Sequence, residues 1–481
     1  MSLGADDLEA APTVADWREA GQFVGTLVHL VFAQANRQGL DYAVVRNYEN
    51  LPHAPGRDID VLVRGTDAAR FAQTVYVAAL NCGFRVICDK ARSSVRSISV
   101  CLIRGSEIHA LTIDIIEQLF WRLLPIVEPD QVLASARTGA HGIRQVAPGV
   151  DAALRLTKVV LHRERLDSYK AARIIDYYRN DSSRFVETLG FFFSPADIEF
   201  LRRELDGGRL ADLAENFRGG RMQMTARGLL HNPRLLGQWF AWITWSVVGS
   251  RAALGKNVVF IGPDGSGKST MVQRLSQLFA DHAYRRVLVR HGGLALFPRL
   301  RDVAKIMGIK PAPRQDFTAK HSGSEVAPHS LRRLLFYFSY YGFEGFVGKF
   351  VVAWRRRRGQ IVMFDRYVYD FYVQPAYRLA PTPLLDMLRR LWPRPDIVFL
   401  LLADPQAVYR RKPELQPADI AAQQDGIREL ASRLSGRIRV IELDTSDWTI
   451  GALDHAVEVI AEGMTPPSLA RHRSIVLPAP S

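Results

Sequence analysis

The feature that most constrains the fold is the run from Val258 to Thr270, which reads VVFIGPDGSGKST. Its four apolar residues are mostly β-branched or aromatic and predict a buried strand. The turn that follows fits the pattern G-x-x-x-x-G-K-[S/T], through Gly262, Gly267, Lys268 and Ser269. Apolar residues then recur at helical spacing, namely Val272, Leu275, Leu278 and Phe279. This order of strand, glycine-rich turn and helix predicts a loop that binds polyphosphate, and an accidental glycine-rich turn is the alternative.

The residue types in the turn have physical reasons. Glycines let the backbone bend so that successive N–H groups point at phosphate oxygens, and the helix adds the positive end of its dipole. Lys268 supplies a cation for the terminal phosphates, and Ser269 offers a hydroxyl to Mg²⁺. We therefore expect ATP and Mg²⁺ as cofactors. The residues expected to bind the nucleotide are Gly262, Asp264, Gly265, Ser266, Gly267, Lys268, Ser269 and Thr270.

Size and charge limit the classes of protein. With 481 residues, of which 48% are hydrophobic, the chain is expected to form two or three domains. The net charge of +14 suits phosphate-bearing ligands, nucleic acid or an anionic membrane surface, and a generally Arg-rich surface is the alternative. Nucleic acid is not expected as a partner, because no helix-turn-helix or aromatic RNA-binding motif is present. Peripheral membrane contact and a homodimer stay open.

The cellular location of the protein is predicted from three features that the sequence lacks. The N-terminus lacks a basic segment followed by an apolar core, so no signal peptide is expected. No apolar run reaches the roughly 18 residues of a membrane span. The three cysteines, Cys82, Cys88 and Cys101, have no zinc-like spacing and are typical of reduced core residues. A cytoplasmic protein is expected.

The patterning along the chain predicts an α/β protein in several parts. We expect a flexible leader (1–19), a small α+β domain (20–120), a helical domain or connector (121–250), a P-loop NTPase domain (251–463) and a disordered tail (464–481). In the fourth part, apolar strands alternate with helices, which is typical of a parallel sheet flanked by helices on both faces. Residues 292–323 are expected to form an irregular insert or lid.

A second chemical site is predicted where the strand over 361–365 ends in Asp365 and Arg366. In P-loop proteins an Asp at the end of a core strand contacts Mg²⁺, directly or through water. An adjacent Arg can neutralise charge on the acceptor or on the transferring group. A helix-capping Asp beside a surface Arg is the alternative.

Residues 255–463 resemble thymidylate kinase and its nucleoside-monophosphate kinase relatives. The resemblance is carried by the run 262–270, by Asp365-Arg366-Tyr367, and by Asp404-Pro405 leading to Arg410-Arg411-Lys412. It implies a kinase in which the basic cluster closes over the phosphates and residues 442–446 wrap the adenine. The catalytic residues that it implies are Lys268, Asp365, Arg366, Arg410 and Arg411.

The resemblance does not extend to the acceptor. Thymidylate kinases follow Asp-Arg-Tyr with a Ser and an Ala-Tyr-Gln that holds the thymine, whereas this chain has the run from Val368 to Pro375, VYDFYVQP. The chain is therefore expected to be an ATP-dependent phosphotransferase with an unidentified small-molecule acceptor, either a nucleoside monophosphate or a sugar or polysaccharide precursor. An ATP-binding regulatory module coupled to the first domain is the alternative.

Three carboxylates mark the first domain. Asp58 and Asp60 share one face of a predicted strand, and Asp114 lies on a later strand. Such a cluster can hold divalent cations, so a second metal site is predicted. Residues 20–120 resemble the nucleotidyltransferase superfamily that includes DNA polymerase beta, which would imply a bifunctional nucleotidyltransferase–kinase. Arg46-Asn47 stands where that family has Gly-Ser, and the alternative is a pair of solvated carboxylates held by Arg57 or Arg64.

Overall fold

The computed structural model describes residues 23–462 except 93, 105–106, 122–123, 211–212, 214–216, 218–254, 284–285, 295, 298–330, 374–379, 437 and 447–449. The chain divides into two compact units. Unit 1 consists of Met1–Leu102 and Ile108–Val247, and unit 2 consists of Ile103–Glu107 and Val248–Ser481. The predicted leader, the predicted tail and most of the predicted insert lie outside the described residues.

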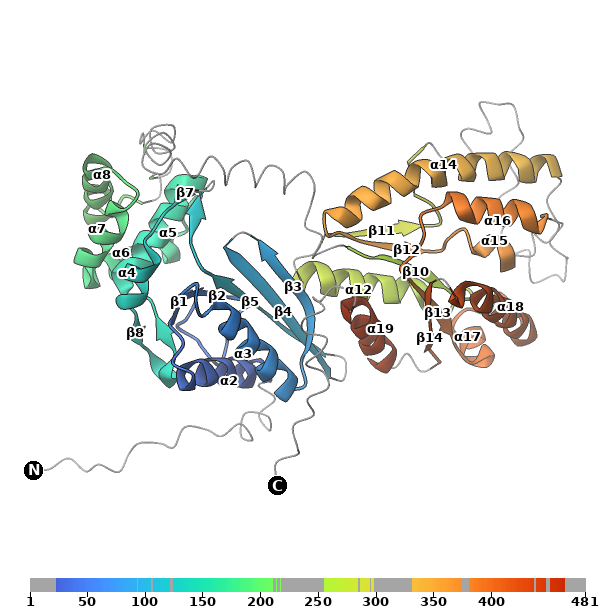
Figure 1. Ribbon diagram of the computed structural model, residues 1–481, viewed down its shortest axis with the longest axis horizontal. Coiled ribbons are helices and arrows are strands. Elements are labelled where there is room, and N and C mark those ends of the chain that lie inside the picture. Colours follow the sequence, from blue (N-terminus) through green and yellow to red (C-terminus); the bar gives the residue numbers. More distant parts are fainter. Residues whose placement is uncertain are drawn as a thin grey trace, which may run out of the picture. The chain divides into compact units, whose positions relative to one another are not determined.

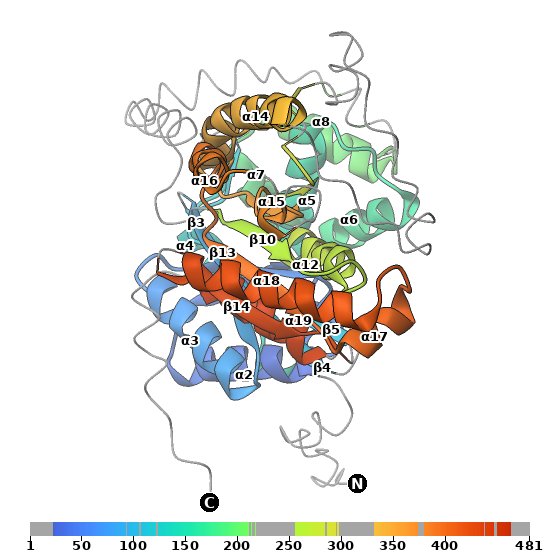
Figure 2. The ribbon, with the colours of Figure 1, turned by 90° about the vertical axis from the view of Figure 1, so that its right-hand side faces the viewer.

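Unit 1 is built on a mixed sheet of seven strands in the order β3-β4-β5-β2-β1-β9-β8. Its five longer strands are β1 (Tyr42–Arg46), β2 (Asp58–Val63), β3 (Arg85–Arg92), β4 (Val95–Arg104) and β5 (Glu107–Ile116). Helices α2 (Phe23–Arg37) and α3 (Ala68–Asn81) lie side by side against this sheet (Figures 1 and 2). The buried rings of Phe32, Tyr42 and Phe71 join the two helices to β1, with centroids 5.3 Å apart for Phe32–Tyr42 and 5.5 Å apart for Tyr42–Phe71.

The sheet continues beyond residue 120, into the part of the chain for which helices were expected. Strands β8 (Arg137–Thr138) and β9 (Arg144–Gln145) extend the sheet, and β9 pairs with β1. Strands β6 (Phe120–Trp121) and β7 (Leu124–Pro125) form a separate hairpin. Strands of two residues carry no alternation of apolar and polar side chains, so the sequence pattern does not reveal them.

The helical part of unit 1 follows the sheet. It contains α4 (Pro129–Ala134), α5 (Pro148–His162), α6 (Ser168–Asn180), α7 (Ser182–Gly190) and α8 (Pro195–Asp206). Helix α8 begins with a capping box, in which Ser194 Oγ accepts from the Asp197 backbone N–H while the Asp197 carboxylate accepts from the Ser194 backbone N–H. Helices α5 to α8 share an apolar core that includes the fully buried Phe185 and Leu201.

Helix α5 also carries a buried charge. Asp151 is fully buried; it accepts hydrogen bonds from Arg155 Nε at 2.5 Å and from the Tyr48 hydroxyl at 3.0 Å. Burial raises the pKa of Asp151, and Arg155 opposes that rise. The hydrogen bond from Tyr48 to Asp151 joins α5 to the segment after β1.

At pH 8, the free energy of unfolding of an Arg155→Met variant is expected to be about 3–5 kcal/mol lower than that of the wild type. The reason is that the buried Asp151 carboxylate is left without the Arg155 cation. The loss should shrink as the pH falls, since Asp151 can then be protonated in the folded protein. Urea unfolding at several pH values measures it. A double variant, Arg155→Met with Asp151→Leu, should recover much of the stability, and equal losses in the single and double variants would contradict this account.

Unit 2 contains a parallel sheet of five strands in the order β11-β12-β10-β13-β14. The strands are β10 (Asn257–Ile261), β11 (Val287–His291), β12 (Ile361–Asp365), β13 (Ile397–Leu402) and β14 (Arg439–Asp444). The predicted parallel sheet is confirmed, and the strand predicted over 361–365 has the predicted bounds. The first strand, β10, lies between β12 and β13. The connections therefore run toward one edge of the sheet on one side of β10 and toward the other edge on its other side. In parallel sheets, ligands bind at such a point, beyond the carboxyl ends of the strands.

Helices cover both faces of this sheet. Figures 1 and 2 show α14 (Leu331–Arg357) and α16 (Thr382–Leu391) on the side of β10 away from α19 (Ile450–Glu462). Side chains of α14 and α16 share an apolar core with Val259 and Phe364. Helix α12 (Lys268–His282) contacts α19 as well as β10, and α17 (Pro405–Arg411) contacts α18 (Pro417–Ser435). Among the described residues, no helix has the length and apolar composition that crossing a membrane requires.

Candidate active site

The glycine-rich loop leaves the carboxyl end of β10 and needs glycine for two different reasons. At Gly262, a Cβ atom would lie 2.5 Å from the Leu401 carbonyl oxygen and 2.6 Å from Ser266 Oγ, closer than real contacts allow. At Gly265 and Gly267, φ is 90°, a left-handed conformation that other residues rarely adopt. The loop therefore bends tightly onto the N-terminus of α12, which presents unpaired backbone N–H groups.

Lys268 begins α12, and its ammonium group turns back into the loop. Its Nζ donates to the carbonyl oxygens of Gly262 and Pro263, each at 2.7 Å. The side chain is nearly buried, and this burial lowers the pKa of Lys268, against the opposing charges of Asp264 and Asp370. A buried cation held by carbonyl oxygens at the mouth of the loop is suited to bind phosphate oxygens.

Ser269 and Asp365 meet beside this lysine. Ser269 Oγ donates to Asp365 Oδ2 at 2.6 Å, although 96 positions separate the two residues in the chain. Parallel pairing of β10 with β12 aligns Phe260 with Asp365, which explains the approach. The other carboxylate oxygen, Oδ1, is buried and has no hydrogen-bond partner among the described residues. A buried, unpartnered carboxylate oxygen next to a hydroxyl fits the oxygen ligands that Mg²⁺ prefers.

Arg366 directly follows Asp365 in the chain and reaches the loop. It adopts φ 80°, an uncommon conformation for a residue with a side chain. Its guanidinium donates to Asp264 Oδ1 at 2.7 Å. Burial raises the pKa of Asp264, but Lys268, Arg366 and Lys412 oppose this, and the net pKa is below the usual range. The loop carboxylate therefore stays ionised and holds Arg366 at the phosphate site.

The predicted basic cluster also borders the loop. A Cβ on Gly265 would meet Lys412 Cβ at 3.1 Å, so the end of α17 lies directly over the glycines. Arg410 and Arg411 are exposed there, and Arg411 donates to the Ser446 carbonyl oxygen. The predicted adenine segment is close by, because Thr445 Oγ1 donates to the Ser266 carbonyl oxygen at 2.9 Å. Lys412, Arg411 and the segment 445–446 therefore lie around the same loop. Thr270 is exposed in the first turn of α12.

Sequence reasoning missed two residues of this site. His291, the last residue of β11, approaches Asp365 Oδ2 through Nδ1 at 3.1 Å. Asp370 begins the short helix α15 (Asp370–Val373), which was not predicted. Burial raises the pKa of Asp370 to about 6, against the opposing charges of Lys268 and Arg366. An acid in the middle of the aromatic run from Tyr367 to Tyr372 has no distinctive spacing, and only its position five residues after Asp365 gives a signal.

The three carboxylates of unit 1 have a different arrangement. Asp60 and Asp114 are aligned partners on the parallel strands β2 and β5. Arg46, rather than Arg57 or Arg64, donates to Asp60 and forms an ion pair with it. Arg64 instead pairs with Asp41 at 2.9 Å.

This arrangement does not meet the prediction of a second metal site. Among the described residues, which include Asp58, Asp60 and Asp114, no group of three His, Cys, Asp or Glu side chains is placed to hold a metal ion. The physical reason is the Arg46 guanidinium, which supplies the positive charge at Asp60. Burial, with the charges of Asp60 and Asp58, raises the pKa of Asp114.

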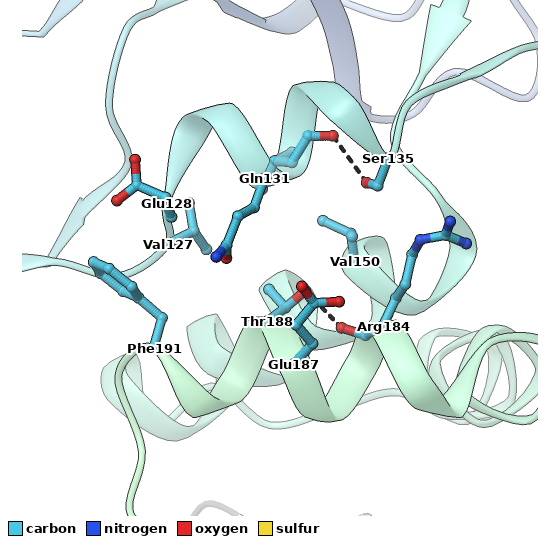
Figure 3. Close-up of a pocket in the computed structure, with 10 residues that line it drawn as sticks. Val127, Glu128, Gln131, Ser135, Val150, Arg184, Glu187, Thr188 and Phe191 are labelled. Atoms are coloured by element: carbon cyan, nitrogen blue, oxygen red, sulfur yellow. Dashed lines mark hydrogen bonds between the residues drawn. The ribbon is translucent and has the colours of Figure 1, made fainter.

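A hollow in unit 1 contains none of the predicted site residues. It lies between α4 and α7, and Figure 3 shows Gln131, Arg184 and Phe191 around it. The hydroxyls of Ser135 and Thr188 in its wall donate to carbonyl oxygens of their own helices, at 2.9 Å and 2.7 Å. These two hydroxyls are therefore already bonded to the backbone.

Comparisons with known proteins concern part of the chain. No family model and no curated protein matches it. Among solved structures, it is similar to thymidylate kinase from Ehrlichia chaffeensis, with 20% identity and a TM-score of 0.28, over 44% of this chain and 99% of that chain. It is also similar to thymidylate kinase from Candida albicans, with 16% identity and a TM-score of 0.30, over 44% of this chain and 92% of that chain. Since both TM-scores are low, the fold of unit 2 is identified by its own strand order and loop geometry.

Proposed function

We propose that unit 2 is a Mg²⁺-dependent phosphotransferase that passes the γ-phosphoryl group of ATP to a small-molecule acceptor. The observation that carries the proposal is the approach of Ser269 to Asp365 at 2.6 Å beside the Lys268 ammonium, with a buried Asp365 oxygen left unpartnered. A hydroxyl, a carboxylate and a lysine in this order around a glycine-rich loop are the parts that P-loop enzymes use.

Each part has a distinct task. The loop N–H groups and Lys268 would bind the β- and γ-phosphates. Ser269 and Asp365 would hold Mg²⁺, which when bound neutralises charge on the phosphate oxygens. Arg366 would stabilise negative charge that builds up on the transferring group, and Arg410 and Arg411 would close over the phosphates. The tasks need little covalent chemistry from the protein, because positioning and charge supply most of the catalysis.

The test is label transfer by the full-length protein. It is incubated with γ-labelled ATP and Mg²⁺ in three separate reactions. The first contains nucleoside monophosphates, the second contains sugars and polyols, and the third contains no acceptor. Labelled product, or ATP hydrolysis by water, supports the proposal. ATP that binds but is neither hydrolysed nor used for transfer would instead support a regulatory module. Transfer of label from α-labelled nucleotide is not expected, because Asp60 of unit 1 forms an ion pair with Arg46.

A further inference from the structure

The carboxylate of Asp370 has a place in the site that the roles above do not explain. It follows the turn after β12, where its backbone N–H donates to the Tyr367 carbonyl oxygen at 3.0 Å. Its charge interacts with Lys268 and Arg366 and with the carboxylates of Asp264 and Asp365. Asp370 therefore lies at the carboxyl edge of the sheet, among the groups that border the phosphate loop.

Asp370 differs from the other two carboxylates of the site in its partners. Asp264 binds Arg366, and Asp365 binds Ser269 and His291. In the part of the chain that the structure describes, the Asp370 side chain makes no hydrogen bond and no ion pair. The residue is half-buried, and a carboxylate without a partner there contributes nothing evident to the stability of the fold. It is, however, free to accept a hydrogen bond from a bound molecule.

The charges around Asp370 limit what that molecule can be. Of the cations whose charge reaches Asp370, Arg366 already donates to Asp264 at 2.7 Å and Lys268 is held in the loop. A second phosphate beside Asp370 would be repelled by that carboxylate and would have to draw one of these two cations from its present partners. A neutral hydroxyl has no such conflict, and it gains from a carboxylate that accepts its proton.

We propose that the acceptor is a hydroxyl group of an uncharged, polyol- or sugar-like molecule, and that Asp370 is the base that removes its proton. The proposal rests on the proposed phosphotransferase function. In the step, the acceptor oxygen forms a bond to the γ-phosphorus, and the bond from that phosphorus to the β,γ-bridging oxygen breaks. The bonding electron pair leaves with ADP, and the hydroxyl proton moves to an Asp370 carboxylate oxygen. Water is the smallest molecule that can take the same place.

The experiment uses water and a panel of acceptors as probes. ATP hydrolysis by the full chain is measured from pH 5 to pH 8 for the wild type, for Asp370→Asn and for Asp281→Asn, a control on an exposed residue of α12. Burial raises the pKa of Asp370 to about 6, so the wild-type rate should rise through that pH and then level off. Asp370→Asn should lose about 10²-fold in kcat together with the rise. The affinity of Asp370→Asn for ATP should stay within about threefold of the wild-type affinity. The rate, pH profile and ATP affinity of the Asp281→Asn control should likewise stay within about threefold of the wild-type values.

Two further results separate this proposal from the proposed function. With γ-labelled ATP, label should pass to polyols or sugars faster than to nucleoside monophosphates. Faster transfer to monophosphates, or an Asp370→Asn variant with wild-type kcat and pH profile, would overturn the role of Asp370 while leaving the phosphotransferase intact. A wild type that binds ATP without any hydrolysis or transfer would overturn both. Asp370→Asn should also melt at an equal or higher temperature than the wild type, so lost activity would not reflect unfolding.

Discussion

Replacing Lys268 with methionine is expected to lower kcat/KM for ATP consumption by about 10³-fold or more. The methionine keeps most of the volume of the buried lysine stem but removes the ammonium that donates to the Gly262 and Pro263 carbonyl oxygens. The lost charge matters most in the transition state, where negative charge spreads over the transferring group. Steady-state kinetics at saturating Mg²⁺ measure the effect.

The same variant also separates catalysis from folding. Burial lowers the pKa of Lys268, so the charged amine is less stable in the folded chain than in water. Lys268→Met should therefore unfold at a temperature equal to or above that of the wild type, while losing activity. Lys349→Met, on an exposed position of α14, is the matched control and should keep both properties. Wild-type turnover in Lys268→Met would remove this lysine from the chemistry.

The architecture of unit 2 could be predicted because its signals are local. Strand β10, the glycine turn and α12 are contiguous, and the change from an apolar run to helical spacing marks each border. Parallel strands alternate with helices, so Asp365 at the end of β12 falls at the same edge of the sheet as the loop after β10. That is why Ser269 and Asp365 could be assigned to one site before their contact was known.

The remaining contacts depend on how distant parts of the chain meet. The pairing of Arg366 with Asp264 and that of Arg46 with Asp60 each join two loops or strands, and no sequence spacing encodes them. His291 is an ordinary strand end until β11 is placed beside β12. In unit 1, the two-residue strands β8 and β9 are held by pairing alone, so the sheet continues where the pattern suggested helices only.

Replacing Asp365 with asparagine is expected to lower kcat by about 10³-fold and to move the Mg²⁺ dependence to higher concentration. The asparagine keeps one oxygen to accept from Ser269 Oγ, but the negative charge and the buried, unpartnered Oδ1 are lost. The loop and Lys268 are unchanged, so the variant should still bind ATP.

A comparison of binding with and without the metal tests the reason for this loss. ATP alone should bind Asp365→Asn at least as tightly as it binds the wild type, because a carboxylate that repels phosphate has been removed. ATP with Mg²⁺ should bind the variant more weakly, because one ligand charge for the metal is missing. Titration calorimetry at a single ionic strength separates the two cases, with Asp281→Asn as the control. If Mg²⁺ strengthens ATP binding equally in Asp365→Asn and in the wild type, Asp365 does not hold the metal. The acid at the end of β12 would then act through its hydrogen bonds to Ser269 and His291 alone.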